Sequence, residues 1–333
     1  MTVPQRTAVT LPNPRGVDAT LEQAVWAEEQ GYDDVWFADS SGIDALTMAV
    51  AVAERTNRVR IGTAIIPVYT RTPAVLASTT HILNKISNGR FILGLGSSSH
   101  TMMENWNGQA FEKPLTRVKE TTQLVREMLS GAKSDFDGVT VQSHGYRQLP
   151  LEPGSQPIYI AALRAKMMEM AAEVGDGVIV NLFPRKVLPR MMEHMKIGAE
   201  RAGKNAADVE VVCRHMVCVT EDLEAARNVI RANFAPYYAT PVYNNFLAWS
   251  GYPEIAAEIK EGWAAKDRAR TTGAITDELV DQIAILGTAE ECHDKIRECA
   301  EGGITTHIIS ATTPNPEEAE ATYNAFTKEN FSF

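Results

Sequence analysis

Basic residues at the start of a helix could bind a phosphate group. The segment Ala161-Ala162-Leu163-Arg164-Ala165-Lys166 leaves a short apolar strand and opens a helix at once. Backbone N–H groups and the helix dipole attract anions at a helix N-terminus. Arg164 and Lys166 add positive charge, although a solvated basic pair is the usual role of such residues. We predict a phosphate site formed by Ala161, Ala162, Leu163, Arg164 and Lys166.

A second segment could lie beneath a planar ring. Residues 60–76 read RIGTAIIPVYTRTPAVL, so an apolar strand passes through small residues into a loop that contains prolines. Gly62, Thr63 and Ala64 let the backbone approach whatever lies above the strand end. Taken alone, the segment is more simply one further barrel strand. Together with the phosphate site it favours a flavin-like mononucleotide that lies across a barrel mouth.

The segment Gly94-Leu95-Gly96-Ser97-Ser98-Ser99-His100 resembles a dinucleotide fingerprint but fails its test. That fingerprint needs a third glycine where Ser99 stands, and an acidic residue about 20 residues later at the end of a strand. Glu120 instead falls within an expected helix. We therefore predict a small-residue loop at which a ligand contacts Gly96, Ser97, Ser98 and the His100 ring. A tight turn capped by serine, with His100 as an ordinary loop histidine, is the alternative.

These segments occupy equivalent places in a repeated unit of strand, loop and helix. Strands are expected over residues 7–11, 35–38, 59–66, 91–94, 158–161, 177–180, 209–219 and 304–310, and helices over 20–30, 44–55, 165–174 and 188–202. Asp44 is a plausible N-cap. Eight strands that alternate with helices predict an α/β fold, a (β/α)8 TIM barrel, whose site lies at the C-terminal ends of the strands. Because no linker interrupts the pattern, residues 1–333 are expected to form one domain.

Two stretches do not fit the barrel repeat. Residues 135–153 contain turn signals on both sides of Val139–Val141, which indicates a β-hairpin before the fifth strand. Residues 237–285 are helical in pattern, rich in polar residues, and lie between the seventh and eighth strands. Insertions on the catalytic face usually shape a substrate pocket.

Composition limits the classes of partner. A formal net charge of −10 argues against nucleic acid and anionic membrane surfaces, which attract clustered Lys and Arg. The N-terminus has no apolar signal segment, and no stretch approaches the roughly 20 apolar residues of a membrane span. We expect a soluble, cytoplasmic protein without a membrane partner. Its four cysteines predict free buried thiols, and its seven histidines show no metal-ligand spacing, so no metal is expected.

The chain resembles the bacterial luciferase-like superfamily. The resemblance rests on Trp36-Phe37-Ala38-Asp39-Ser40, Ile61-Gly62-Thr63-Ala64-Ile65, Gly94-Leu95-Gly96, the run from Glu104 to Leu115, and Gly302-Gly303-Ile304-Thr305-Thr306. More narrowly, the chain is similar to the branch of oxidoreductases that use the deazaflavin coenzyme F420. The resemblance implies a (β/α)8 barrel, a non-prolyl cis peptide at Ala64-Ile65 in the third strand, and a homodimer.

Two positions depart from known members of this family. The sugar-phosphate dehydrogenase of the family has a His directly after the Asp at the end of the second strand and a Glu in the loop after the fourth. Ser40 and Ser99 occupy those places here. We therefore set aside a sugar phosphate as the substrate. Luciferase also has a His at the position of Ser40, so the departure weakens the oxygenase reading as well.

The resemblance implies hydride transfer between F420 and a small-molecule substrate such as an alcohol, a carbonyl compound or an activated alkene. Its cofactor site would include Asp39, Ala64 and Ile65, and its proton donor would be Asp39, Ser40 or His100. The anionic tail of F420 needs cations, which Arg164, Lys166, Arg185 and Lys186 could supply as a positive rim. The alternatives are an FMN-dependent luciferase-like monooxygenase and a non-catalytic (deaza)flavin-binding protein.

Overall fold

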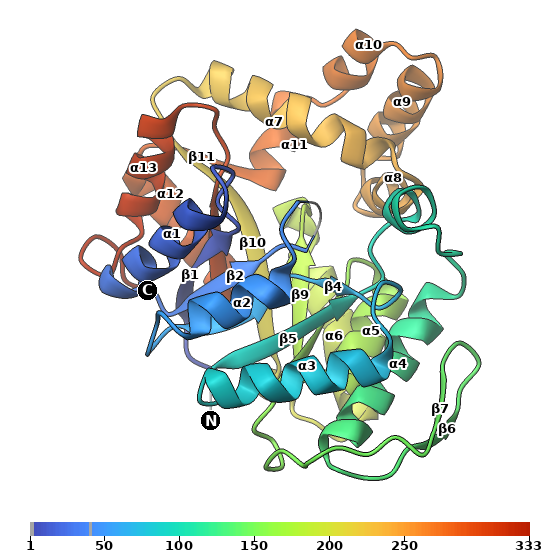
Figure 1. The fold of residues 1–333 in the computed structure, drawn as a ribbon. Coiled ribbons are helices and arrows are strands. Elements are labelled where there is room, and N and C mark those ends of the chain that lie inside the picture. Colours follow the sequence, from blue (N-terminus) through green and yellow to red (C-terminus); the bar gives the residue numbers. More distant parts are fainter. Residues whose placement is uncertain (1–2, 40–41) are drawn as a thin grey trace.

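Parallel strands close into a barrel in the computed structural model, which describes residues 3–39 and 42–333 (Figure 1). Hydrogen-bonded neighbours follow the order β10-β12-β1-β2-β3-β5-β8-β9, and β9 pairs with β10 to complete the ring. The barrel strands are β1 (Arg6–Leu11), β2 (Asp34–Phe37), β3 (Arg60–Thr63), β5 (Phe91–Gly96), β8 (Ile158–Ala161), β9 (Gly177–Asn181), β10 (Glu210–Val219) and β12 (Thr306–Ala311). The predicted (β/α)8 barrel is therefore confirmed.

Helices alternate with these strands and cover the outside of the barrel. They are α1 (Val17–Glu29), α2 (Ala45–Ala53), α3 (Pro73–Ile86), α4 (Pro114–Leu129), α5 (Ala165–Val174), α6 (Leu188–Arg201), α12 (Ala289–Glu301) and α13 (Pro316–Ala325). Short helical turns lie at η1 (Thr101–Trp106), η2 (Arg185–Val187) and η3 (Ala206–Asp208). The carboxylate of Asp44 accepts the Thr47 backbone N–H at 2.7 Å, so the expected N-cap of α2 is confirmed.

The expected hairpin is present, with a different set of residues at its turn. Strands β6 (Asp135–Asp137) and β7 (Gln142–His144) pair in antiparallel fashion. Val139 and Thr140 lie in the turn that connects β6 to β7. Their backbone N–H groups donate to the Glu120 carboxylate on α4 at 2.8 and 2.7 Å. Glu120 therefore fastens the hairpin to the body of the barrel.

The insertion between the seventh and eighth barrel strands is helical, as expected, but begins earlier. It consists of α7 (Leu223–Ala239), α8 (Pro241–Trp249), α9 (Pro253–Ala264), α10 (Arg268–Gly273), α11 (Asp277–Ile283) and β11 (Ala284–Gly287). These helices lie beyond one end of the barrel, at the top of Figure 1, and have an apolar core of their own. Strand β11 pairs with the second half of β10, so the insertion is anchored to the barrel wall.

The barrel interior is filled in layers by residues that alternate along the strands. The middle layer is an apolar cluster of Ala8, Trp36, Ile92, Tyr159, Ile179, Val212 and Ile308. Successive residues of a strand point to opposite faces, so residues two positions away from this layer also face the interior. Residues two positions earlier form the N-terminal layer, and residues two positions later form the layer at the C-terminal mouth.

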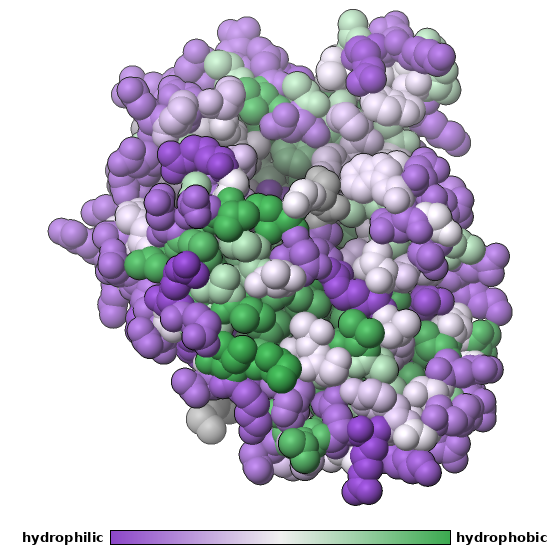
Figure 2. Space-filling view, viewed as in Figure 1, coloured by the Kyte–Doolittle hydropathy of each residue, from purple (hydrophilic) through white to green (hydrophobic). Residues whose placement is uncertain are grey.

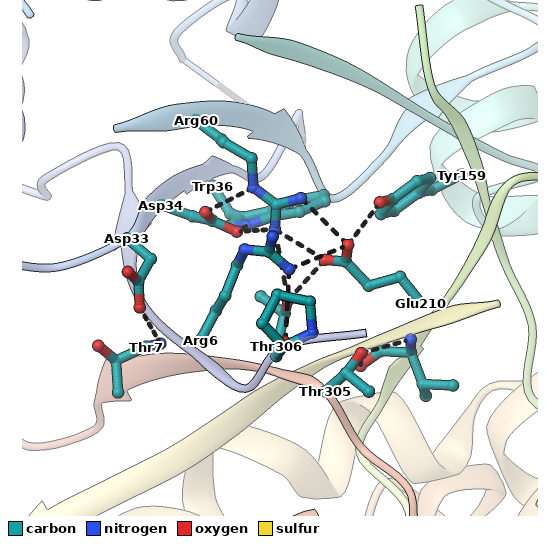
Figure 3. A network of polar contacts seen from close by, with 12 residues as sticks. Arg6, Thr7, Asp33, Asp34, Trp36, Arg60, Tyr159, Glu210, Thr305 and Thr306 are labelled. Carbon is teal, nitrogen blue, oxygen red and sulfur yellow. Dashed lines mark hydrogen bonds and ion pairs between the residues drawn. The ribbon is translucent and has the colours of Figure 1, made fainter. Parts of the chain in front are cut away.

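The N-terminal layer is a buried network of ion pairs (Figure 3). Arg60 donates to Asp34 through Nε at 2.8 Å and through Nη2 at 2.6 Å, and to Glu210 at 2.7 and 3.0 Å. Thr306 and Tyr159 donate their hydroxyls to Glu210 at 2.6 and 2.8 Å. Burial raises the pKa of Asp34 in spite of the charge of Arg60. For Glu210, burial also acts to raise the pKa, but hydrogen bonds from Arg60 outweigh it and the pKa is lowered.

Two further expectations concern the whole chain. All four cysteines are buried and unpaired, as expected. Across the ranges 3–39 and 42–333, we find no helix with both the length and the apolar character needed to cross a membrane.

Candidate active site

The predicted cofactor segments meet at the C-terminal mouth of the barrel. Asp39 comes after β2 and Ala64-Ile65 comes after β3. Gly96 is the last residue of β5 and Ala161 the last of β8, and the remaining predicted residues of each segment follow directly. These four strands are consecutive neighbours in the sheet. Ser40 lies outside the described residues, so its suggested role stays a prediction.

The third barrel strand is interrupted where a ring floor was expected. The peptide bond Ala64-Ile65 is cis, which confirms the prediction, and it separates β3 from β4 (Ile66–Pro67). Ala64 donates its N–H to the carbonyl of Phe37 at 2.6 Å. Ala64 and Ile65, together with Ala161, pack on the apolar interior cluster. Ala64, Ile65 and Ala161 together form an apolar floor at the mouth.

Glycines of β5 permit this close approach of the strands. A Cβ at Gly94 would lie 1.7 Å from the Thr63 carbonyl oxygen, and a Cβ at Gly96 would lie 2.3 Å from Ile65 Cδ1. Thr63 also binds Gly94 through its hydroxyl, which accepts the Gly94 N–H at 2.8 Å. Glycine is therefore required at these positions by space, because the floor and β5 are in direct contact.

In the loop after β5, the two predicted serines lie at the mouth, whereas the predicted histidine is largely exposed to solvent. Ser97 and Ser98 are half-buried at the mouth, and Ser98 has a φ of 63°. The His100 side chain is 60% exposed and pairs with Glu104 through Nε2 at 3.2 Å, at the start of the π-helical turn η1. The expectation that His100 faces a ring or a substrate therefore stays a prediction.

Asp39 is part of an ion-pair cluster that the sequence did not indicate. Its carboxylate accepts from Arg71 Nη1 at 2.7 Å and from the Ala45 backbone N–H at 3.2 Å. Arg71 also pairs with Asp44, the N-cap of α2. Arg71 therefore joins the loop after β4 to the loop after β2. It lies in the proline-containing loop, and its charge in an otherwise uncharged segment was the available signal.

The predicted phosphate site has cations that are free to bind a ligand. Arg164 is the N-cap residue of α5, Lys166 lies in its first turn, and both side chains are exposed. Within the described parts of the chain, neither side chain has a hydrogen-bond or ion-pair partner. Arg185 and Lys186, the other two residues of the expected positive rim, contact the helical insertion, and their part in the rim stays a prediction. Arg185 donates to the Ala284 carbonyl at 2.8 Å, and Lys186 lies 3.6 Å from the ring centroid of Tyr252, so both hold the helical insertion.

A polar wall at the mouth was missed entirely by the sequence analysis. Asn181, Arg214 and Ser310 lie two positions after Ile179, Val212 and Ile308, so they face the interior at the mouth. Arg214 Nη2 donates to Ser310 Oγ at 2.9 Å. Arg214 Nε and Asn181 Oδ1 are shielded from solvent, and neither atom has a hydrogen-bond partner among the described residues. A charged residue in the middle of the apolar run of β10 was the signal that could have revealed this wall.

Tyrosines of the surrounding helices lie beside Arg214. The phenols of Tyr237, Tyr243 and Tyr323 are close enough to act on its pKa, which burial lowers. Burial raises the pKa of Tyr243 to about 12, so this phenol is neutral at physiological pH. Figure 2 shows the surface hollowed below α7, between α8–α10 and the side of the barrel that bears α1 and α13. Tyr237 on α7 and Tyr243 on α8 place the helical insertion beside the polar wall.

Comparison with known proteins identifies the class. Residues 1–306 match the luciferase-like monooxygenase family. The chain is 32% identical over 297 residues to 5,10-methylenetetrahydromethanopterin reductase of Methanolobus tindarius, covering 88% of this chain and 90% of that protein. It is 28% identical over 307 residues to a putative coenzyme F420-dependent oxidoreductase of Mycobacterium tuberculosis, covering 86% and 88%.

A solved structure agrees with this assignment at the level of the fold. The coenzyme F420-dependent tetrahydromethanopterin reductase of Methanopyrus kandleri superposes with a TM-score of 0.81 at 22% identity, covering 99% of this chain and all of that one. The chain belongs to the luciferase-like monooxygenase family. The prediction of an oxidoreductase of this class is therefore confirmed.

Proposed function

We propose that the protein is an F420-dependent oxidoreductase that transfers a hydride between the deazaflavin and a small organic substrate. The observation that carries the proposal is the floor of Ala64, Ile65 and Ala161, which offers a flat apolar surface at the catalytic end of the barrel. The name of the Mycobacterium tuberculosis relative, a putative coenzyme F420-dependent oxidoreductase, supports F420 as the cofactor.

The residues at the mouth fit a tricyclic ring with a phosphorylated tail. The cis segment Ala64-Ile65 would lie under one face of the ring, and Gly96–Ser98 would border its edge. Backbone N–H groups at the start of α5, with Arg164 and Lys166, would hold the phosphate. When bound, F420 supplies the carbon that gives or receives the hydride. The protein holds donor and acceptor together, on the order of 3–3.5 Å apart, and excludes water.

Proton transfer needs a group near the ring, and His100 is our first choice. A histidine ordinarily titrates near neutral pH, so it can both give and take a proton. The Asp39 carboxylate accepts hydrogen bonds from Arg71 and from the Ala45 backbone, so it is better suited to holding the loops together than to transferring a proton. The acceptor that we propose is a polarised double bond in a carbonyl compound or an activated alkene, or the corresponding alcohol in the reverse direction.

The decisive experiment compares the two cofactors directly. Purified protein is titrated at moderate salt with F420 and, separately, with FMN, and the dissociation constants are determined from fluorescence. We expect F420 to bind at least about tenfold more tightly, a difference of about 1.4 kcal/mol. Micromolar FMN binding without detectable F420 binding would instead favour an FMN-dependent monooxygenase. F420 binding without turnover of any carbonyl, alcohol or alkene substrate would favour a non-catalytic binding protein.

A second prediction concerns the affinity of the phosphate site for F420. The double variant Arg164→Ala/Lys166→Ala should weaken F420 binding at least about tenfold, since two cations near one phosphate are lost. The matched control is Arg55→Ala/Lys85→Ala. It removes the same charge at the ends of α2 and α3 that precede β3 and β5, at the opposite end of the barrel. If both double variants keep an affinity within a factor of about two of the parent, the phosphate binds elsewhere.

A homodimer and a cytoplasmic location remain part of the proposal. Val75 and Ile82 on α3 are 50% and 53% exposed, and Figure 2 shows apolar side chains on the face that bears α2 and α3. An exposed apolar face of this kind supports association with a second copy. Sedimentation velocity of the purified protein distinguishes a dimer from a monomer.

A further inference from the structure

Arg214 is a half-buried cation whose hydrogen bond goes to a neutral hydroxyl. Among the residues that the structure describes, its hydrogen-bond partner is Ser310, and no aspartate or glutamate forms an ion pair with it. The titratable groups that act on it are the three phenols named above. A guanidinium held in this way has lost part of its hydration without gaining an opposite charge.

Arg60, at the other end of the barrel interior, shows the contrast. Arg60, in the N-terminal layer, pairs with both Asp34 and Glu210, and the network contains its own negative charge. Arg214 stands at the mouth, where a ligand can enter. The missing counter-charge at this level is therefore expected from the ligand rather than from the protein.

Strand order places Arg214 on the wall opposite the cis segment Ala64-Ile65. In the ring β10-β12-β1-β2-β3-β5-β8-β9, β10 is four strands away from β3 in both directions. A ring that rests on Ala64-Ile65 would thus turn its free face toward Arg214. The hydride acceptor must lie on that free face, so Arg214 lies on the substrate side of the mouth.

We propose that Arg214 anchors the substrate by binding a carboxylate, with Asn181 and Ser310 as its polar neighbours. The proposal rests on the proposed function, because it takes the floor at Ala64-Ile65 as the cofactor side. It makes the substrate an organic acid whose reducible bond is near its carboxylate. Arginine is suited to this task, since its planar fork of N–H donors matches the two carboxylate oxygens.

The neighbouring side chains fit this role. Asn181, on the adjacent strand β9, is in register with Arg214, and its Oδ1 has no hydrogen-bond partner in residues 3–39 and 42–333. Rotation of the Asn181 amide would let its NH₂ group donate a hydrogen bond to a carboxylate that is bound by Arg214. Ser310 already accepts from Arg214 and holds the guanidinium in place, while its hydroxyl hydrogen can donate to the ligand.

The test is a binding measurement with benzoate and benzamide, which have similar shape but differ in charge. Saturation-transfer NMR titrations are made with the protein alone and with the F420-loaded protein, at constant ionic strength. We expect benzoate to bind at least about tenfold more tightly than benzamide. Arg214→Met should remove this preference, while Arg55→Met, at the other end of the barrel, should keep it.

A second variant leaves Arg214 in place. Asn181→Asp puts a carboxylate beside the guanidinium with almost no change in shape, so Arg214 gains an internal counter-charge. We expect it to weaken benzoate binding at least about tenfold and to leave benzamide binding within a factor of about two.

Several results would overturn the proposal. Equal binding of benzoate and benzamide to the unaltered protein would show that the mouth does not select a carboxylate. Undiminished benzoate binding in Arg214→Met or Asn181→Asp would place the carboxylate elsewhere. A tenfold loss of F420 affinity in Arg214→Met would make Arg214 a cofactor ligand. Because the benzoate titration of the protein alone needs no cofactor, failure of the F420 assignment would be seen separately.

Discussion

Arg60→Met is expected to lower the free energy of unfolding by about 3–5 kcal/mol, because it leaves two buried carboxylates without their shared partner. Asp34 is fully buried, and Glu210 is 6% exposed. Once Arg60 is removed, the nearest remaining cation is Arg6, whose Nη1 lies 3.5 Å from Glu210 and whose side chain is more exposed than Glu210. Denaturant unfolding followed by circular dichroism measures the change.

The pH dependence of this variant has a defined sign. In the parent, the lowered pKa of Glu210 contributes stability above the unfolded pKa, which is lost as pH falls through the folded pKa. Without Arg60, burial would raise the folded pKa of both Asp34 and Glu210. The folded variant would then bind more protons than the unfolded chain, so its stability should rise as pH falls. We expect the gap between parent and variant to be smaller at pH about 5.5 than at pH about 7.5.

An exposed ion pair provides the matched control. Lys196 and Glu200 are one helical turn apart on α6, at 3.7 Å, with side chains 66% and 61% exposed. Lys196→Met should change the free energy of unfolding by less than about 0.5 kcal/mol, because water screens such pairs. An Arg60→Met variant that is no less stable than Lys196→Met, or whose deficit does not depend on pH, would contradict a structural role for the network.

Local patterns in the sequence predict the barrel well. The apolar runs of β8 and β10 were placed to within one residue, since a buried parallel strand is continuous in hydrophobicity. Asp44 was predicted as a helix cap from its type and place alone. The cis bond at Ala64-Ile65 was predicted from the family resemblance rather than from propensity. The expectation that residues 1–333 form a single domain stays a prediction.

Contacts between distant segments could not be predicted in the same way. Arg185 was expected at a positive rim, but its guanidinium binds a carbonyl 99 residues later in the chain. Arg214 could be seen as a charged residue in an apolar strand, yet its direction follows only from the register of β10 with β9 and β12. A one-residue change of register would turn it out of the barrel. Side chains whose roles depend on register and on insertions therefore required the structure.

Gly94→Ala is expected to lower the free energy of unfolding by about 3 kcal/mol or more, because the added methyl group meets backbone rather than a movable side chain. Its Cβ would lie 1.7 Å from the Thr63 carbonyl oxygen and 2.8 Å from the Thr63 carbonyl carbon. Thr63 directly precedes Ala64, so relief of the overlap must displace the floor. We therefore expect weaker F420 binding as well, measured by fluorescence on the folded fraction.

Two other glycines show whether contact or loss of glycine causes the effect. At Gly273, on α10, a Cβ would meet nothing within 4 Å, so Gly273→Ala should stabilise the protein by up to about 1 kcal/mol. At Gly96 the overlap is with Ile65 Cδ1, the end of a flexible side chain, at 2.3 Å. Gly96→Ala should therefore be less destabilising than Gly94→Ala while still disturbing the floor through Ile65. A Gly94→Ala protein as stable as Gly273→Ala would show that β5 and the floor are not in the tight contact that defines this site.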